Sequence, residues 1–214
     1  MVLRQKIKYA YRGQFNPDKL VNTNIDYLST GLVRPKLKLL ELGAATGFMS
    51  EYFRRHLGCQ VVTVDINPEV KPDIAGDLNE TAVWQKIRRR APYDLVFASA
   101  ILEHLPRPET TLQLIKAVLK PKGELIVTLP NIVHWRARAK LLLGRFEYED
   151  YGLFDRTHLR FFTYFTGQRL IKDAGFTIKK ILIDPAGGMK YFDWLVKHWP
   201  NLYAHQICLY AVKP

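Results

Sequence analysis

The residues best suited to chemistry begin at a short turn bracketed by two glycines. An apolar run ends in Glu41 and is followed by Gly43 and Gly47, after which the pattern becomes helical. A strand that ends in such a turn lets a ligand approach bare backbone, because glycine has no Cβ. The following helix directs its free N–H groups and the positive end of its dipole at the same place. The turn therefore predicts a site for a ligand that carries a carboxylate or a phosphate.

The spacing of these glycines excludes two common nucleotide sites. A dinucleotide site needs G-x-G-x-x-G, whereas only Ala44, Ala45 and Thr46 lie between the two glycines here. A P-loop ends in Gly-Lys-Ser/Thr, whereas Phe48 follows Gly47. The pattern that remains is E-x-G-x-x-x-G.

A second candidate, Asp65, follows the next apolar run, Gln60 to Val64. It lies about 22 residues beyond Gly43, an offset at which an acid can accept hydrogen bonds from ribose hydroxyls. The alternative is that Asp65 only caps the turn that runs to Pro68. We favour the ribose role.

The elements that must position these residues follow from the spacing of apolar side chains. Apolar runs predict strands at 36–42, 60–64, 73–75, 93–98, 124–129, 177–183 and 206–212. Helical spacing predicts helices at 17–30, 46–57, 108–119, 133–143 and 166–174, and a basic run at 86–90 reads as the exposed end of another helix. Strands that alternate with helices predict an α/β fold, a doubly wound parallel sheet with helices on both faces. Such sheets bind ligands beyond the carboxyl ends of their strands.

The bulk composition fits one folded domain of 214 residues with an anionic partner. The net charge of +12 suggests a nucleic acid, a phosphorylated substrate or a membrane surface, although scattered surface charge is the stronger alternative. Two cysteines, Cys59 and Cys208, are too few for a disulfide framework and suggest a cytoplasmic protein. We expect no transmembrane segment, because the apolar run at Leu95–Leu102 is far short of about 20 residues.

Several segments, taken in order, resemble class I methyltransferases that use S-adenosylmethionine. Glu41–Gly47 resembles their first motif, and Leu119–Val127 resembles their "LKPGG-x-L-x-V" lead into strand five. The others are Tyr93–Phe97 running into Leu102–Leu105, then Pro130-Asn131, Gly144–Tyr148 and Asp155–Thr163. The last two look like a subgroup near the MetW-like and ubiquinone-type O-methyltransferases. The resemblance covers roughly Lys36 to Phe176.

The resemblance implies a Rossmann-like sheet of seven strands, mostly parallel with an antiparallel C-terminal strand. It implies a single domain, in which 1–35 form a helical lid or cap, 36–130 bind the cofactor, and 131–214 supply acceptor-side helices and final strands. S-adenosylmethionine is the implied cofactor. The residues implied to bind it are Glu41, Gly43, Ala45, Gly47, Asp65, Ile66, Asp77, Leu78 and Ser99. Asp77 would meet the adenine amine, with a turn carboxylate as the alternative, and Glu41 would fasten the loop or the amino group.

The chain departs from the family pattern at two alanines. Ala45 stands where the first motif usually has glycine, a change that should take little space. Ala100 replaces the first acid of the E-x-x-E-H cluster that ubiquinone-type enzymes look to use for a metal. We therefore expect no metal.

Two histidines are the candidates for a general base, if the methyl acceptor is a hydroxyl. His158 and His104 are preferred in that order, against the alternative that either is a supporting or surface residue. Asp155 could orient His158. On the acceptor side, Arg156 and Arg160 could pair with phosphate or carboxylate, and surface positions are equally compatible with both; Asn131 is assigned to the same side.

Aromatic residues near both ends of the chain could close over the site or form core. They are Tyr9, Tyr11, Phe15, Tyr191, Phe192, Trp194 and Trp199. Met189 to Tyr203 would also suit contact with lipid headgroups.

The sequence thus predicts a methyltransferase for a small-molecule acceptor that is anionic or lipid-linked, with the hydroxyl of a glycan, lipid-linked or quinone-like compound preferred. An RNA methyltransferase and a non-catalytic, MetW-like partner protein remain as alternatives.

Overall fold

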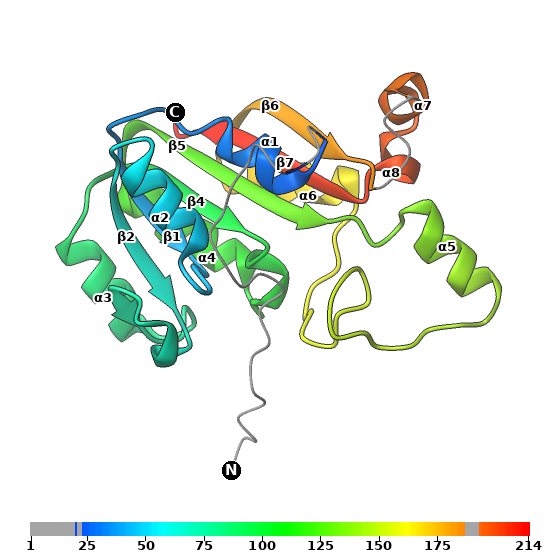
Figure 1. Cartoon of the computed structure of the whole chain (residues 1–214), viewed down its shortest axis with the longest axis horizontal. Helices are drawn as coiled ribbons and strands as arrows, with labels where there is room; N and C mark the ends of the chain where they lie inside the picture. Colours follow the sequence, from blue (N-terminus) through cyan, green and yellow to red (C-terminus); the bar gives the residue numbers. More distant parts are fainter. Residues whose placement is uncertain (1–19, 21–22, 187–192) are drawn as a thin grey trace, which may run out of the picture.

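The computed structural model describes residue 20, residues 23–186 and residues 193–214. Seven strands form one sheet in the order β3-β2-β1-β4-β5-β7-β6 (Figure 1). The strands are β1 (Lys38–Leu42), β2 (Gln60–Asp65), β3 (Ile74–Ala75), β4 (Tyr93–Ser99), β5 (Leu119–Pro130), β6 (Thr177–Asp184) and β7 (Gln206–Val212). Strand β7 runs antiparallel to both of its neighbours, β5 and β6, and the other pairings are parallel. The predicted sheet, including its antiparallel last strand, is confirmed.

Helices cover both faces of the sheet. They are α1 (Ile25–Thr30), α2 (Phe48–Arg55), α3 (Thr81–Arg89), α4 (Pro108–Val118), α5 (Trp135–Leu142), α6 (Tyr164–Asp173), α7 (Asp193–His198) and α8 (Pro200–Tyr203), with short 3₁₀ helices η2 (Pro68–Val70) and η3 (Leu102–His104). Alternate residues of the central strands face opposite sides, so Leu39 packs with α1 and α2 while Leu40 packs with α3, α4 and α6. Strands buried on both faces explain the continuous apolar runs in the sequence.

Some element boundaries differ from the sequence prediction. Strand β5 begins five residues earlier than expected, because Leu119 pairs with Tyr93 across an irregularity in the β4–β5 ladder. Helix α1 begins only at Ile25, where the Asn24 side chain accepts the backbone N–H of Asp26 at 2.8 Å. Residues 1–19 and 21–22 of the expected lid, with Tyr9, Tyr11 and Phe15, lie outside the described residues.

The carboxyl ends of β1, β2, β4 and β5 lie along one edge of the sheet, as the parallel pairings require. Beyond β5 the chain leaves the sheet through α5, at the right of Figure 1, and makes a wide loop before it returns to α6. Within the described ranges, none of the helices is long and apolar enough to cross a bilayer.

Candidate functional site

The loop after β1 adopts the glycine-dependent conformation that its sequence predicted. Gly43 and Gly47 have φ angles of 72° and 76°, in the left-handed region. The backbone N–H groups of Gly43 and Ala44 both donate to the carbonyl oxygen of Val64, at 2.9 and 3.1 Å, which fixes the loop against the end of β2. Gly47 is the N-cap of α2, and a Cβ at this position would meet nothing within 4 Å. The backbone is therefore open to a ligand at the start of α2.

Ala45 lies in the same loop with a φ angle of 49°. A left-handed conformation costs a residue with a Cβ roughly 1–2 kcal/mol. The replacement of the usual glycine therefore has a conformational cost, which the prediction that Ala45 takes little space did not include.

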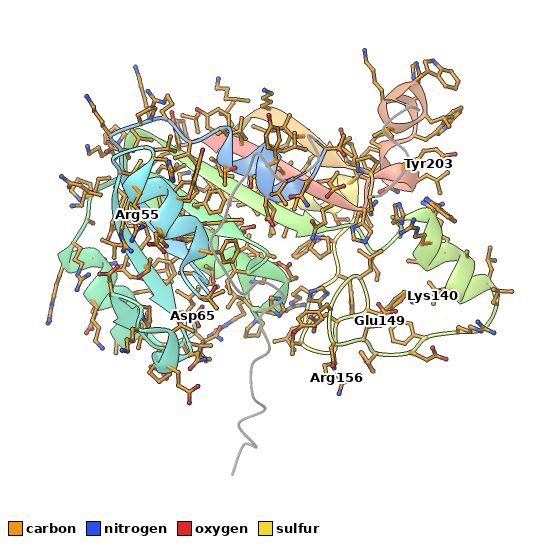
Figure 2. All side chains as sticks on the ribbon, viewed as in Figure 1. Arg55, Asp65, Lys140, Glu149, Arg156 and Tyr203 are labelled. Carbon is orange, nitrogen blue, oxygen red and sulfur yellow. The ribbon has the colours of Figure 1, made fainter. Side chains whose placement is uncertain are left out.

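Asp65 joins the loops that follow β1 and β2. It is only 6% exposed. Its Oδ2 accepts the backbone N–H of Ala45 at 2.8 Å, and its Oδ1 accepts that of Asn67 at 2.8 Å. The second contact is the turn cap that we considered, and the first ties Asp65 to the glycine loop as well. Each carboxylate oxygen accepts more than one hydrogen bond, so a ribose contact is compatible with both. Figure 2 labels Asp65 at the carboxyl end of β2, and its neighbour Ile66 is 54% exposed there.

The predicted adenine contacts lie at the end of β3. Asp77 Oδ1 accepts both the backbone N–H and the side-chain amide of Asn79, each at 2.8 Å, which is the turn role considered as an alternative. Leu78 is buried, and its carbonyl accepts the indole N–H of Trp84 at 2.8 Å. Their contact with adenine stays a prediction.

Glu41 and Ser99 have structural partners inside the protein. The Glu41 carboxyl group is buried and accepts the hydroxyl of Ser50, which fastens α2 to β1. Burial raises the pKa of Glu41 to about 7. The hydroxyl of Ser99 lies 2.9 Å from that of Thr128 and joins the end of β4 to β5. Of the two roles considered for Glu41, this contact supports the fastening of the loop.

The two predicted histidines meet beyond the end of β4. The ring centroids of His104 and His158 are 4.9 Å apart, with the rings edge to face. They meet because the carbonyl oxygen of Glu103 accepts the backbone N–H groups of Leu159 and Arg160, at 2.8 and 3.0 Å. This pair of bonds holds the chain after β5 against η3.

The side chain of Glu103 completes this cluster and was missed as a site residue. It is 1% exposed, and its Oε2 has no hydrogen-bond partner among the described residues. Burial raises the pKa of Glu103 to about 8, so that the carboxyl group carries a proton at neutral pH. Burial lowers the pKa of His104 and of His158, and the nearby charge of His104 lowers that of His158 further. Both imidazoles are consequently neutral near pH 7. The signal available in the sequence was an acid, Glu103, directly beside the candidate histidine His104.

Asp155 acts on His104 through Thr157. Its Oδ1 accepts the backbone N–H and the hydroxyl of Thr157, at 2.8 and 2.6 Å. The Thr157 hydroxyl lies 3.0 Å from His104 Nδ1, and the Thr157 carbonyl oxygen lies 3.2 Å from it. Asp155 therefore has a defined link to His104, whereas its orientation of His158 stays a prediction.

The remaining acceptor-side residues also contact protein groups. Arg156 pairs with Asp150 at 3.1 Å, and Arg160 donates through Nε to the carbonyl oxygen of Pro106 at 2.9 Å. Asn131 is fully buried and donates to the carbonyl oxygen of Ala204 at 2.6 Å, while its own side-chain oxygen has no partner in the described part of the chain. Their contact with an acceptor stays a prediction. Of the aromatic residues at the end of the chain, Trp194 and Trp199 are 61% and 51% exposed, whereas Tyr191 and Phe192 lie outside the described residues.

Among the described residues, one group of side chains could hold a cation. Glu103, His104 and His158 each offer one ligand atom, and these atoms lie within 4.8 Å of one another. One carboxylate with two imidazoles is a donor set that divalent transition metals accept. Because burial keeps Glu103 protonated, a cation would first have to displace that proton, and the expected absence of a metal stays a prediction.

Comparison with known proteins agrees with the fold. A family model described as "Methyltransferase domain" matches residues 11–181. The ubiquinone biosynthesis O-methyltransferase of Xanthomonas campestris pv. campestris (strain B100) is 27% identical over 117 residues, which are 50% of this chain and 48% of the relative. That of Xylella fastidiosa (strain 9a5c) is also 27% identical, over 50% of this chain and 47% of its own. The chain thus spans about half the length of the curated relatives it matches.

Two solved structures share the fold over most of the chain. A SAM-dependent methyltransferase from Archaeoglobus fulgidus superposes with a TM-score of 0.61 at 17% identity, covering 88% of this chain and 90% of that one. Phosphoethanolamine N-methyltransferase 2 of Haemonchus contortus, in complex with S-adenosyl-L-methionine, superposes with a TM-score of 0.57 at 15% identity, covering 90% of this chain and 52% of that one.

The geometry of the loop fits the methyl donor of this family. A Cβ on Gly43 would lie 2.9 Å from the Ile101 side chain, so this position of the turn requires glycine. A Cβ on Gly47 would meet nothing within 4 Å, so there is open space beside the N-terminus of α2. Asp65 holds the two loops that border this space together. With a family match over residues 11–181, the chain belongs to the class I methyltransferases, which use S-adenosyl-L-methionine as methyl donor.

Proposed function

We propose that the protein transfers a methyl group to a hydroxyl of a small molecule, of the glycan, lipid-linked or quinone-like kind. The observation that carries this proposal is the contact of two imidazoles, His104 and His158, beside buried Glu103 beyond the end of β4. A neutral imidazole can accept the proton that a hydroxyl must lose. The names of the curated relatives support O-methylation, although they match over only about half of their length. Both cysteines, Cys59 and Cys208, are free and buried, which supports a cytoplasmic setting.

S-adenosylmethionine supplies an electrophilic methyl group, and the residues of this chain supply position and proton transfer. Alignment of the reacting groups can account for about 7–11 kcal/mol of the barrier. With its proton on Nδ1, His104 donates to the Thr157 carbonyl oxygen at 3.2 Å, which leaves Nε2 as the basic atom. We assign His104 as the base on this ground and His158 as its neighbour in the same cluster.

The first test asks whether the cofactor binds. S-adenosylmethionine or its demethylated product should raise the melting temperature, and no shift at millimolar ligand would contradict the proposal. Incubation with methyl-labelled cofactor and fractions of a host extract should then label a small molecule. Label in RNA alone would favour the nucleic-acid alternative, and cofactor binding without any labelled product would favour a non-catalytic partner protein.

Substitution of the histidines tests the chemistry. We expect His104→Asn to lower turnover by about 10²–10⁴-fold with cofactor affinity unchanged. His158→Asn should have a smaller effect, and His56→Asn, an exposed control at the C-cap of α2, should have none. Because burial lowers the pKa of His104, turnover should be lost only below the ordinary pKa of histidine, about 6.5. Full activity of His104→Asn would contradict the assignment of His104 as the base. Loss of wild-type activity in a chelator would contradict a mechanism without a metal.

A further inference from the structure

The chain between β5 and the histidine segment forms a projecting arm, defined here as residues 135–148. It consists of α5 and the start of the wide loop beyond the end of β5, at the right of Figure 1. Every residue from 140 to 148 is exposed. Leu142 and Leu143 are 87% and 72% exposed, and Leu141 is 48% exposed. Three consecutive leucines in water at the end of a helix are unusual for a surface that functions alone.

The arm is held in place at its base and left bare at its tip. Ala137 is buried with Leu153 and Phe154, and the ring of Phe146 lies 5.1 Å from that of Phe154. Lys140 forms an ion pair with Glu149, and Figure 2 shows the two labelled residues beside each other across the loop. None of the apolar clusters in the described part of the chain includes the three leucines. The arm thus presents them on an anchored element.

Positive charge and aromatic rings accompany the leucines. Trp135, Phe146 and Tyr148 are 40%, 50% and 60% exposed. The arm carries the basic residues Arg136, Arg138, Lys140 and Arg145 against one acid, Glu147. The helical spacing of three and four residues places Trp135, Arg138 and Leu142 on one face of α5. Apolar side chains that enter the acyl region, amphipathic rings at headgroup level and basic groups beside phosphates are the features of an interfacial surface.

We propose that the arm docks on an anionic lipid surface. The charge decides between this occupant and a second copy of the chain. A symmetric contact would oppose the basic residues of one arm to those of the other, in a protein whose net charge is +12. Anionic headgroups instead complement that charge while the leucines leave water. The inference goes beyond the proposed methyl transfer, because it requires no catalytic residue.

Docking would also place the site. The arm continues into Glu149, whose backbone forms an isolated β-bridge with Asp155, and then into the segment that carries His158. A membrane surface at the arm would therefore lie on the predicted acceptor side, next to the segment that carries His158.

Co-sedimentation of the whole protein with vesicles tests the proposal. We expect binding to phosphatidylcholine vesicles that contain phosphatidylglycerol, more than tenfold weaker binding to phosphatidylcholine alone, and weakening as salt rises. The double variant Leu142→Glu with Leu143→Glu should lose more than tenfold in binding. Its matched control is Phe165→Glu, which adds a charge to another exposed apolar residue, 59% exposed, outside the arm. Arg136→Gln with Arg145→Gln should weaken binding several-fold, and the α3 control Arg88→Gln with Arg89→Gln should leave it unchanged.

Other outcomes would overturn the inference. Equal binding to neutral and anionic vesicles, or an equal loss in the leucine variant and the Phe165 control, would remove the arm as a docking surface. A dimer in light scattering that the leucine variant dissociates, without vesicle binding by the wild type, would assign the arm to a second copy. Methylation of a water-soluble acceptor by the leucine variant, at the wild-type rate, would separate loss of docking from failure of the catalytic proposal.

Discussion

Two parts of the molecule at the carboxyl ends of the strands are built in different ways: the predicted cofactor edge, which follows β1 and β2, and the predicted acceptor edge, residues 131–162, which follows β5. At the cofactor edge, strands β1 and β2 pair along their whole length, and Asp65 and the Val64 carbonyl hold the glycine loop. At the acceptor edge, residues 131–162 contain only α5 and two isolated bridges, Asn131 to Phe162 and Glu149 to Asp155. The core beneath this region consists of Ala137, Leu153 and Phe154 with Ile132 packed against them.

The contrast fits the roles predicted for the two edges, cofactor binding and acceptor binding. A cofactor that many enzymes share needs one backbone shape, and paired strands with satisfied hydrogen bonds fix that shape. An acceptor differs between enzymes, and an irregular segment over a small core can differ with it. Glu103 lies at the junction of the two edges. Its side chain is buried, and its carbonyl oxygen accepts the hydrogen bonds that hold the segment after β5.

The largest expected effect concerns one buried acid at each edge. The folded-state pKa values of Glu103 and Glu41, about 8 and about 7, exceed the ordinary value of 4.5. A raised folded pKa gives stability that is fully present below pH 4.5 and lost as pH rises through the folded value. Between these limits only the unfolded chain releases the proton. We therefore expect Glu103→Gln to gain stability relative to the wild type from about pH 4.5 to 8, by up to about 1.4 kcal/mol per pH unit.

Urea unfolding at a series of pH values measures this difference. Glu41→Gln should show the same sign, with its gain ending near pH 7. Its gain should also be smaller, because Gln loses part of the contact with Ser50, whereas Glu103 Oε2 has no partner in the described chain. A Glu103→Gln difference that is flat with pH would show that Glu103 ionises normally.

The two edges also differ in how far the sequence predicts them. The cofactor edge was legible because continuous apolar runs end at Leu42, Asp65 and Ser99, where parallel strands must bring their ends together. At the acceptor edge both histidines could be named from the sequence. Their contact, however, depends on hydrogen bonds that the Glu103 carbonyl oxygen accepts from the backbone N–H groups of Leu159 and Arg160, more than fifty residues away. Backbone contacts between irregular segments leave no periodic trace in a sequence. The exposed leucines 141–143 fell within the predicted helix 133–143, and nothing in the sequence indicated that they lack a core to pack on.

The next prediction separates ribose binding from turn capping at the cofactor edge. We expect Asp65→Ala to weaken S-adenosylmethionine binding more than tenfold, because charge-assisted hydrogen bonds contribute about 1.5–3 kcal/mol each and the loop also loses its anchor. Asp77→Ala gives a comparison at the predicted adenine contact, where Asp77 accepts hydrogen bonds from Asn79. It should weaken binding less. Calorimetric affinity that is unchanged in Asp65→Ala, with the loop still folded, would remove Asp65 from the cofactor site.

The smallest effect should come from Ala45, the alanine of the glycine loop that has a left-handed φ angle. Ala45 has a φ angle of 49°, and its backbone N–H donates to Asp65 at 2.8 Å. Ala45→Gly keeps this donor and removes the left-handed strain of roughly 1–2 kcal/mol, partly offset by the greater freedom of glycine in the unfolded chain. We expect a net stabilisation below about 1 kcal/mol in urea unfolding, with cofactor affinity unchanged or slightly higher. Ala44→Gly, at a neighbouring position that does not have a positive φ, should destabilise instead. If both glycine variants lowered the stability of the protein equally, Ala45 would not be strained. The cofactor edge would then be no more tightly specified than the acceptor edge.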